Sequence, residues 1–311
     1  MHNRLCIGLL SLCFFSKVDA APVTALAFTS DDTSLLAASG EQVRVCAPQT
    51  GETLTTMSCH PMRVSTMAFS PDGALLAVGG GVAGENGEVR LFDWAAKKWL
   101  GGVAADHDLV TSVAFHPAGE LLATASADNT VRIYRIVDHG AHLVEQWRGA
   151  HTAPVQAAAF SRDGKIILSA SLDRSIKVWS SANGALLHSL GQHTDAVHSM
   201  AVRPSADAPL VCATAGDDRT VRIWQPSIGR MIRIVRKHEG AILALVFAPD
   251  GGSLYSAGQE GIVRQIDAES DAILAQWQAS TDWIYTMAIA HDGRLLATGD
   301  WHGRIQVKAV R

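Results

Sequence analysis

An apolar segment of six residues recurs along the chain at nearly constant spacing. Its copies end at residues 28, 69, 115, 160, 202, 247 and 289, so they lie 41 to 46 residues apart. Most copies interleave apolar residues with small or polar ones, as in 110–115 (Val-Thr-Ser-Val-Ala-Phe). A fixed period of this length is typical of proteins built from repeated structural units, so the chain is predicted to contain seven such units.

Each unit repeats the same order of strands and turns. A turn such as 70–73 (Ser-Pro-Asp-Gly) follows the first apolar run, and a second strand such as 121–124 comes next. A tight turn with an acidic residue, an alternating third strand such as 131–134 and a looser fourth strand complete most units. Pro, Asp and Gly favour tight turns, and the alternation favours strands. Four short strands repeated seven times, without a helical pattern, predict an all-β fold: a single seven-bladed β-propeller of four-stranded blades over residues 21–311.

This repeat resembles that of the WD-repeat propeller family over about residues 22–310. The resemblance implies a hydrogen-bonded tetrad of His, Ser or Thr, Asp and an aromatic residue inside a blade. In three units the hydroxyl residue lies four positions before the Asp and the aromatic residue six after it. The implied tetrads are His107, Thr124, Asp128 and Tyr134; His151, Ser169, Asp173 and Trp179; and His193, Thr214, Asp218 and Trp224. The Gly-His and Trp-Asp dipeptides of the family are absent, since Ala150 precedes His151 and Ser180 follows Trp179.

Composition narrows the functional classes. Hydrophobic residues make up 48% of the 311 residues, which is enough for a large core, and the formal net charge is −4. That charge argues against a strongly basic surface, so no nucleic-acid partner is expected. No apolar run reaches ~18 residues, so no membrane span is predicted. The five cysteines are scattered without a C-x-x-C pair, which excludes a zinc ribbon or a thioredoxin-type site.

The His, Ser and Asp sets could suggest a hydrolytic triad, but they recur in several units whereas catalysis needs one site. We therefore interpret them as structural and predict no catalytic residue, metal or cofactor. The Arg and Lys residues of the third strands are expected on the non-core face. The innermost strands offer a ring of residues around the central channel that contains one His and no acid: Thr24, Ser65, Thr111, Gln156, His198, Leu243 and Tyr285. Such a ring is a poor acid–base or metal constellation.

Large aromatic residues gather in the last unit, where Trp283, Tyr285 and Trp301 lie near its polar turns. A tryptophan at a loop tip suits an interface anchor. We therefore expect a non-enzymatic interaction scaffold, monomeric by itself, that binds a protein or peptide partner on a propeller face through these residues. The alternative is an exported propeller enzyme, or a binder of sugars or other small ligands, that acts at the channel mouth.

Residues 1–20 support two interpretations. Arg4, the apolar stretch 5–15 and the small-residue end at Val18-Asp19-Ala20 are typical of a signal peptide. This interpretation predicts an exported protein, periplasmic or extracellular, whose mature chain begins at Ala21. In the other, which the family resemblance implies, residues 10–15 form the fourth strand of the seventh blade and protect its edge in a cytoplasmic protein.

Overall fold

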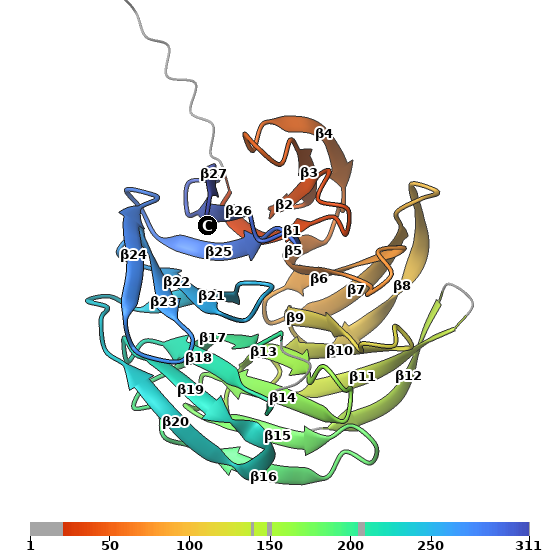
Figure 1. Cartoon of the computed structure of the whole chain (residues 1–311). Coiled ribbons are helices and arrows are strands. Elements are labelled where there is room, and N and C mark those ends of the chain that lie inside the picture. The colour runs from red at the N-terminus through yellow and green to blue at the C-terminus, as the bar shows by residue number, and fades with distance from the viewer. Residues whose placement is uncertain (1–20, 138–139, 148–150, 205–208, 311) are drawn as a thin grey trace, which may run out of the picture.

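The computed structural model describes residues 21–137, 140–147, 151–204 and 209–310, which form seven antiparallel sheets around a central axis (Figure 1). The predicted seven-bladed all-β propeller is therefore confirmed. Six sheets have four strands, and the last has three within the described residues. In each sheet the strands pair in sequence order. One short 3₁₀ helix, η1 (Pro226–Ile228), interrupts the described strands.

The blades are numbered along the chain. The strands of blades 1 to 3 are β1 (Val23–Phe28), β2 (Leu35–Ser39), β3 (Gln42–Cys46), β4 (Thr53–Ser58), β5 (Arg63–Phe69), β6 (Leu75–Val82), β7 (Asn86–Asp93), β8 (Lys98–Asp106), β9 (Val110–Phe115), β10 (Leu121–Ser126), β11 (Val131–Val137) and β12 (Gly140–Trp147). The strands of blades 4 and 5 are β13 (Val155–Phe160), β14 (Ile166–Ser171), β15 (Ile176–Ser180), β16 (Leu186–Leu190), β17 (Val197–Val202), β18 (Cys212–Gly216), β19 (Val221–Gln225) and β20 (Arg230–Val235). The strands of blades 6 and 7 are β21 (Ile242–Phe247), β22 (Ser253–Gly258), β23 (Ile262–Asp267), β24 (Ile273–Gln278), β25 (Ile284–Ile289), β26 (Leu295–Asp300) and β27 (Ile305–Ala309).

The turn between the first two strands of a blade is held by a short side chain and an aspartate. In blade 2 the Ser70 hydroxyl donates to Asp72 at 2.5 Å and accepts from the Leu75 N–H at 2.9 Å. Gly73 follows with a φ of 71°, in the left-handed region that glycine adopts without steric cost. Blade 4 repeats this arrangement with Ser161 and Asp163. The Ser-x-Asp-Gly pattern therefore fixes the hairpin locally, before any contact between blades.

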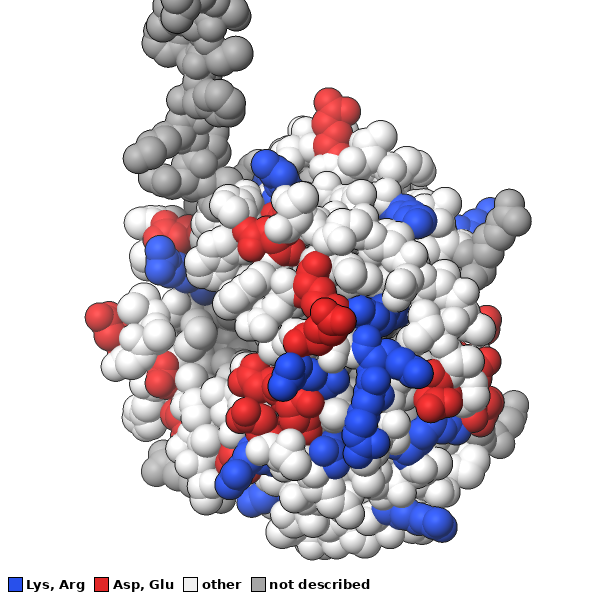
Figure 2. Space-filling view, turned by 90° about the vertical axis from the view of Figure 1, so that its left-hand side faces the viewer, with Lys and Arg blue, Asp and Glu red and all other residues white. Residues whose placement is uncertain are grey.

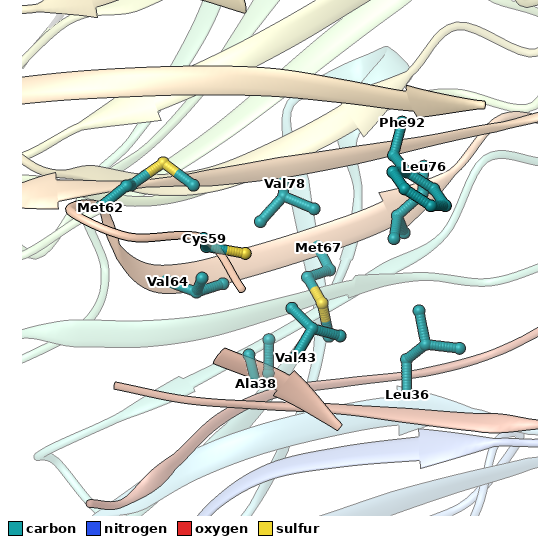
Figure 3. Packing of buried hydrophobic residues seen from close by; sticks show 11 residues of the cluster. Leu36, Ala38, Val43, Cys59, Met62, Val64, Met67, Leu76, Val78 and Phe92 are labelled. Carbon is teal, nitrogen blue, oxygen red and sulfur yellow. The ribbon is translucent and has the colours of Figure 1, made fainter. Parts of the chain in front are cut away.

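The core lies between neighbouring blades. Figure 3 shows the cluster between blades 1 and 2, in which Leu36 and Val43 of blade 1 face Met67, Leu76 and Val78 of blade 2. Comparable clusters fill the other interfaces between blades. Each blade buries apolar side chains against its neighbours, so the ring, rather than the single blade, is the unit that forms the core.

The ring closes where blade 7 meets blade 1. Val23, Leu26 and Phe28 pack with Ala288 and Ala297 in one apolar cluster. The Asp32 carboxylate also accepts hydrogen bonds from the Nδ1 and backbone N–H of His291, both at 2.9 Å, and from the Asp292 N–H at 2.9 Å. Residues 1–20 lie outside the described residues, so neither interpretation of that segment is addressed by this contact.

Charged side chains of both signs lie side by side on the flank where β20 and β24 form the outer edge (Figure 2). Arg203 of blade 5 forms an ion pair with Glu269 of blade 6. Arg233 of β20 donates to the carbonyls of Ala268, Glu269 and Ser270. This flank therefore uses part of its positive charge to join two blades. No helix among the described residues is long and apolar enough to cross a membrane.

Candidate functional site

The structure brings together the four residues of the tetrads implied for blades 4 and 5. In blade 4, the His151 Nε2 lies 2.8 Å from the Ser169 Oγ and its Nδ1 lies 2.9 Å from Asp173, while the Trp179 Nε1 donates to Ser169 at 3.0 Å. Blade 5 repeats this geometry. His193 lies 2.7 Å from Thr214 and 2.8 Å from Asp218, and Trp224 donates to Thr214 at 2.7 Å.

The protonation states in blade 4 suit a structural network. Burial lowers the pKa of His151, and the nearby Asp173 only partly opposes this effect, so the imidazole is neutral near pH 7. Burial alone would raise the pKa of Asp173, but hydrogen bonds from Ser175 and the Thr152 N–H, with His151, bring it to about 2. The Nδ1–H of His151 then donates a hydrogen bond to the Asp173 carboxylate, and its Nε2 accepts a hydrogen bond from the Ser169 hydroxyl. Ser169 is fully buried, so its hydroxyl is out of reach of a substrate.

Blade 6 contains a related network with a glutamate in place of the aspartate. The His238 Nε2 lies 2.9 Å from the Ser256 Oγ, and its Nδ1 lies 3.2 Å from Glu260. Arg264 donates to both oxygens of Glu260, at 2.7 and 2.8 Å. Ile266 fills the position of the tryptophan. The polar networks therefore extend over three consecutive blades, 4 to 6.

The tetrad implied for blade 3 does not form as predicted. His107 is exposed, and the buried Thr124 hydroxyl has no hydrogen-bond partner among the described residues. Asp128 instead accepts from Thr130 and Arg132, while Tyr134 is buried. The reason is spacing: His107 lies three residues before its strand β9, whereas His151 lies four before β13.

The arginines of the third strands also differ from expectation. Arg132, Arg222 and Arg264 were expected on the non-core face, yet only 3 to 6% of their surface is exposed. Each pairs with the acidic residue four positions earlier, at 2.8, 3.1 and 2.7 Å. An arginine of the same blade therefore neutralises the charge of each of these acidic residues. The spacing of four residues between acid and arginine is the feature of the sequence that could have predicted these ion pairs.

The predicted channel ring coincides with seven β-bulges. In every blade the ladder between the first two strands shifts register at the ring residue, as at Thr24 between Val23 and Ala25. A bulge inserts one unpaired residue and redirects its side chain. Three ring hydroxyls use that direction to join blades: Thr24 donates to the Val64 carbonyl at 2.7 Å, Thr111 to Val155 at 2.5 Å, and Ser65 to Val110.

The other four ring residues make no such bond to the next blade within the described part of the chain. They are Gln156, His198, Leu243 and Tyr285. His198 instead lies 2.9 Å from Asp217 of its own blade. The ring residues of blades 1 to 3 are therefore engaged in hydrogen bonds between blades, whereas those of blades 4 to 7 make no hydrogen bond of this kind within the described residues.

Blade 7 carries a row of three aromatic rings, formed by Trp283, Tyr285 and Trp301 and called here the aromatic ladder. The ring centroids of Trp283 and Tyr285 are 6.3 Å apart, those of Tyr285 and Trp301 are 5.4 Å apart, and the planes are tilted by 33° and 30°. The Trp301 N–H donates to the Trp283 carbonyl at 3.1 Å, which ties the two loops together. Both tryptophans are about half exposed, at 44 and 49%.

Polar groups border the ladder. Asp282 pairs with His302, and Asp300 accepts from the Ser280 hydroxyl at 2.7 Å. Burial, with a smaller contribution from Asp282, raises the pKa of Tyr285, so its phenol stays protonated and can donate a hydrogen bond. The ladder is thus an apolar surface with donors and acceptors at its margin, which is the composition of a binding hot spot.

The described residues contain no group of three or more His, Cys, Asp or Glu side chains arranged to hold a metal ion. Cys46, Cys59 and Cys212 are buried free thiols. Burial raises the pKa of Cys59 to about 11, so its thiol stays protonated and is a poor nucleophile.

Four-stranded blades with buried His-Ser/Thr-Asp-Trp networks define a WD-repeat β-propeller, and the chain belongs to that family. The model for the N-terminal domain of nucleolar protein 10-like proteins matches residues 26–233, and the model for the WD domain, G-beta repeat, matches residues 229–267 and 272–307. The resemblance inferred from the repeat is therefore confirmed.

Individual relatives match about half of the chain. The chain is 30% identical to the COMPASS component SWD3 of Saccharomyces cerevisiae over 157 residues, which cover 50% of this chain and 47% of that protein. It is 32% identical to transducin beta-like protein 3 of Bos taurus over 165 residues, 52% of this chain and 20% of that protein. It is 30% identical to periodic tryptophan protein 2 of Arabidopsis thaliana over 190 residues, 59% of this chain and 20% of that protein. The matched segments thus span about half or less of these relatives.

Proposed function

We propose that this chain is a non-enzymatic interaction scaffold that binds a protein or peptide partner on the propeller face that carries the aromatic ladder. The observation that carries the proposal is the pair of half-exposed tryptophans, Trp283 and Trp301, held beside Tyr285 by a backbone hydrogen bond. Rigid aromatic side chains provide large contact area at low entropic cost, and they dominate binding energy at interfaces. One relative is named as a COMPASS component, which accords with such a role.

The position of the ladder supports the same proposal. Trp283 precedes β25 and Trp301 follows β26, and the corresponding connections of blade 4 carry His151 and Asp173. The ladder therefore lies at the end of the blades where the buried networks anchor the loops. Loops on a rigid scaffold are the usual carriers of binding function.

The test is quantitative affinity capture from the native source with the full chain as bait. We expect Trp301→Ala and Trp283→Ala each to reduce the recovery of at least one partner by about tenfold or more, as truncation of a hot-spot residue does. Leu54→Ala is the matched control, because Leu54 is an exposed apolar residue on β4 in blade 1. Unfolding temperatures verify that the variants fold.

An unchanged set of partners for both tryptophan variants would refute the proposed site. A sugar or a metal ion that raises the unfolding temperature of the wild-type chain, but not of Trp301→Ala, would instead support a small-ligand binder at the channel mouth.

We also propose the division of the chain into residues 1–20 and a propeller of residues 21–311. The intact mass of the protein from its native source tests this boundary. A chain that begins at Ala21 would support a cleaved leader. A chain that retains residues 1–20 would exclude cleavage and leave the closing-strand interpretation.

A further inference from the structure

An apolar pocket of about 540 Å³ opens between the outer strands of blades 1 and 2. Val45 and Met57 of blade 1 line one side, and Phe92, Trp94, Lys97 and Trp99 of blade 2 line the other. Phe92 also belongs to the core cluster of Figure 3, where it lies beside Leu76. The pocket is therefore an outward opening of this core, and its volume is within the range of small-molecule sites, about 300–1,000 Å³.

The walls of the pocket are held by contacts among aromatic rings. Phe92 meets Trp99 at 5.1 Å and Trp94 at 6.2 Å between ring centroids, and Trp94 meets Phe69 at 5.3 Å, all in edge-to-face geometry. Blade 4 has smaller or aliphatic residues at the corresponding places: Ser181 for Trp94 and Leu186 for Trp99. The aromatic walls are therefore particular to blade 2 and are not required by the repeat.

Lys97 is the charged residue of the lining, and its position is unusual. Its Nζ lies 3.4 Å from the centroid of the Trp94 ring, and no carboxylate of the described residues lies within ion-pair distance of it. Its φ is 53°, in the left-handed region. Blades 1 and 4 place Gly51 and Gly184 at the same point of the turn, with φ of 73° and 67°. The chain thus keeps a lysine at the pocket where the backbone favours glycine.

We infer that this pocket binds a small amphiphilic carboxylate. The apolar body of the ligand lies against Phe92, Trp99 and Met57, and its carboxylate lies on the Lys97 ammonium group. Charge complementarity decides the class of ligand, because the charge presented by the lining is a single positive one without an acidic partner. The ammonium group has three donors, and those that do not face the Trp94 ring are available for a carboxylate. This site is separate from the aromatic ladder of blade 7 and does not depend on the proposed function.

Decanoate is the probe for the test, used below its micelle-forming concentration with the full chain. Binding is measured by titration calorimetry and by the change in tryptophan fluorescence. We expect saturable binding of decanoate at one site, weaker binding of decanol, and no comparable binding of decyltrimethylammonium. Absence of saturable binding, or equal binding of the cationic and anionic probes, would overturn the inference.

Two variants assign the site. Lys97→Gly restores the residue that other blades use, so it keeps the turn, and we expect it to weaken decanoate binding by about tenfold or more while decanol binding is unchanged. Trp99→Leu introduces the residue type of blade 4 and should weaken both probes. Lys165→Ala removes one positive charge from an exposed turn of blade 4 and is the matched control. A decanoate affinity in Lys97→Gly equal to that of the wild type would refute the assignment.

Discussion

Thr214 of blade 5 and Thr124 of blade 3 occupy corresponding positions, but their hydroxyls differ in their partners. Thr214 bonds to His193 and Trp224, whereas the Thr124 hydroxyl is buried without a partner among the described residues. We expect Thr214→Val to lower the free energy of unfolding by about 2–3 kcal/mol, because it leaves the buried ring nitrogens of His193 and Trp224 without this hydrogen-bond partner. Thr124→Val should be neutral or stabilising by about 1 kcal/mol, because it removes an unsatisfied one.

Urea unfolding of both variants, followed by circular dichroism, measures this difference. Each variant is the control of the other, since both replace a buried threonine by its near-isostere in the second strand of a blade. Equal losses in the two variants would show that the network in blade 5 adds nothing beyond packing.

The second prediction at this scale concerns His238 in blade 6. Burial, followed by the Arg264 guanidinium, lowers its pKa from 6.5 to about 4, although Glu260 opposes the shift. Between these two values the unfolded chain binds a proton that the folded chain does not, so stability falls as the pH falls from 6.5 to 4. The contribution reaches at most about 3 kcal/mol at the acid end.

The free energy of unfolding measured from pH 7 to pH 4 tests this effect. We expect His238→Gln to be less stable than the wild type at pH 7 and the difference to shrink toward pH 4. His107→Gln, which replaces an exposed imidazole outside the polar networks, is the control variant. A His238→Gln difference that is constant with pH would contradict the prediction.

At the scale of elements, one turn holds the two ends of the described ring together. Asp32 has a φ of 55°, and the turns of blades 2 and 4 place Gly73 and Gly164 at the same point. Asp32→Gly therefore suits the backbone and removes only the carboxylate that holds His291 and Asp292. We expect it to lower the free energy of unfolding by about 1–2 kcal/mol, the loss of charge-assisted hydrogen bonds at a half-buried site.

Chemical denaturation measures the loss, and Asp72→Gly in the turn of blade 2 is the comparison, because Asp72 bonds only within its own turn in the described structure. If Asp32→Gly were as stable as the wild type, the apolar cluster around Val23 and Ala288, with the hydrogen bond from Arg44 to the Gly303 carbonyl, would account for the contact between blades 1 and 7.

The strands and their order could be predicted from the sequence because both arise from local patterns: alternation, Asp-Gly turns and a fixed period. The tetrads of blades 4 and 5 could be located by position, since a repeat places equivalent residues at equivalent points. The prediction for His107 was wrong because it rested on the spacing of Thr124 and Tyr134 from Asp128. It did not take into account the number of residues between the histidine and strand β9. One missing residue in that loop moves the imidazole away from Thr124.

Contacts between blades could not be predicted in the same way. The hydrogen bonds between Asp32 and His291 join residues 259 positions apart. The pocket between blades 1 and 2 is lined by residues from six separate strands and turns. Both features are nevertheless visible in the local sequence, because Asp32 and Lys97 occupy turn positions at which other blades have glycine. At these two turns, the side chain at the left-handed position takes part in a feature between two blades.

At the scale of the whole molecule, stability should vary around the ring. Blades 4 and 5 have complete polar networks that tie the incoming loop to two strands. Blade 7 instead has Ser280 at the position of the histidine, and the Thr298 hydroxyl donates a long hydrogen bond of 3.4 Å to the Gln306 carbonyl. Regions with fewer buried contacts open more often and exchange their amide hydrogens faster. The aromatic ladder would then lie on the more adaptable part of the ring.

Hydrogen–deuterium exchange of the full chain tests this gradient. We expect peptides from β26 and β27 to exchange at least about tenfold faster than peptides from β14 and β15, a difference of ~1.4 kcal/mol in opening free energy. The strands β18 and β19, whose blade has a complete network, serve as the reference and should match β14 and β15. Uniform exchange around the ring would mean that packing between blades, rather than the polar networks, sets local stability. The ladder would then be a rigid surface, and a partner would bind it without ordering the loops.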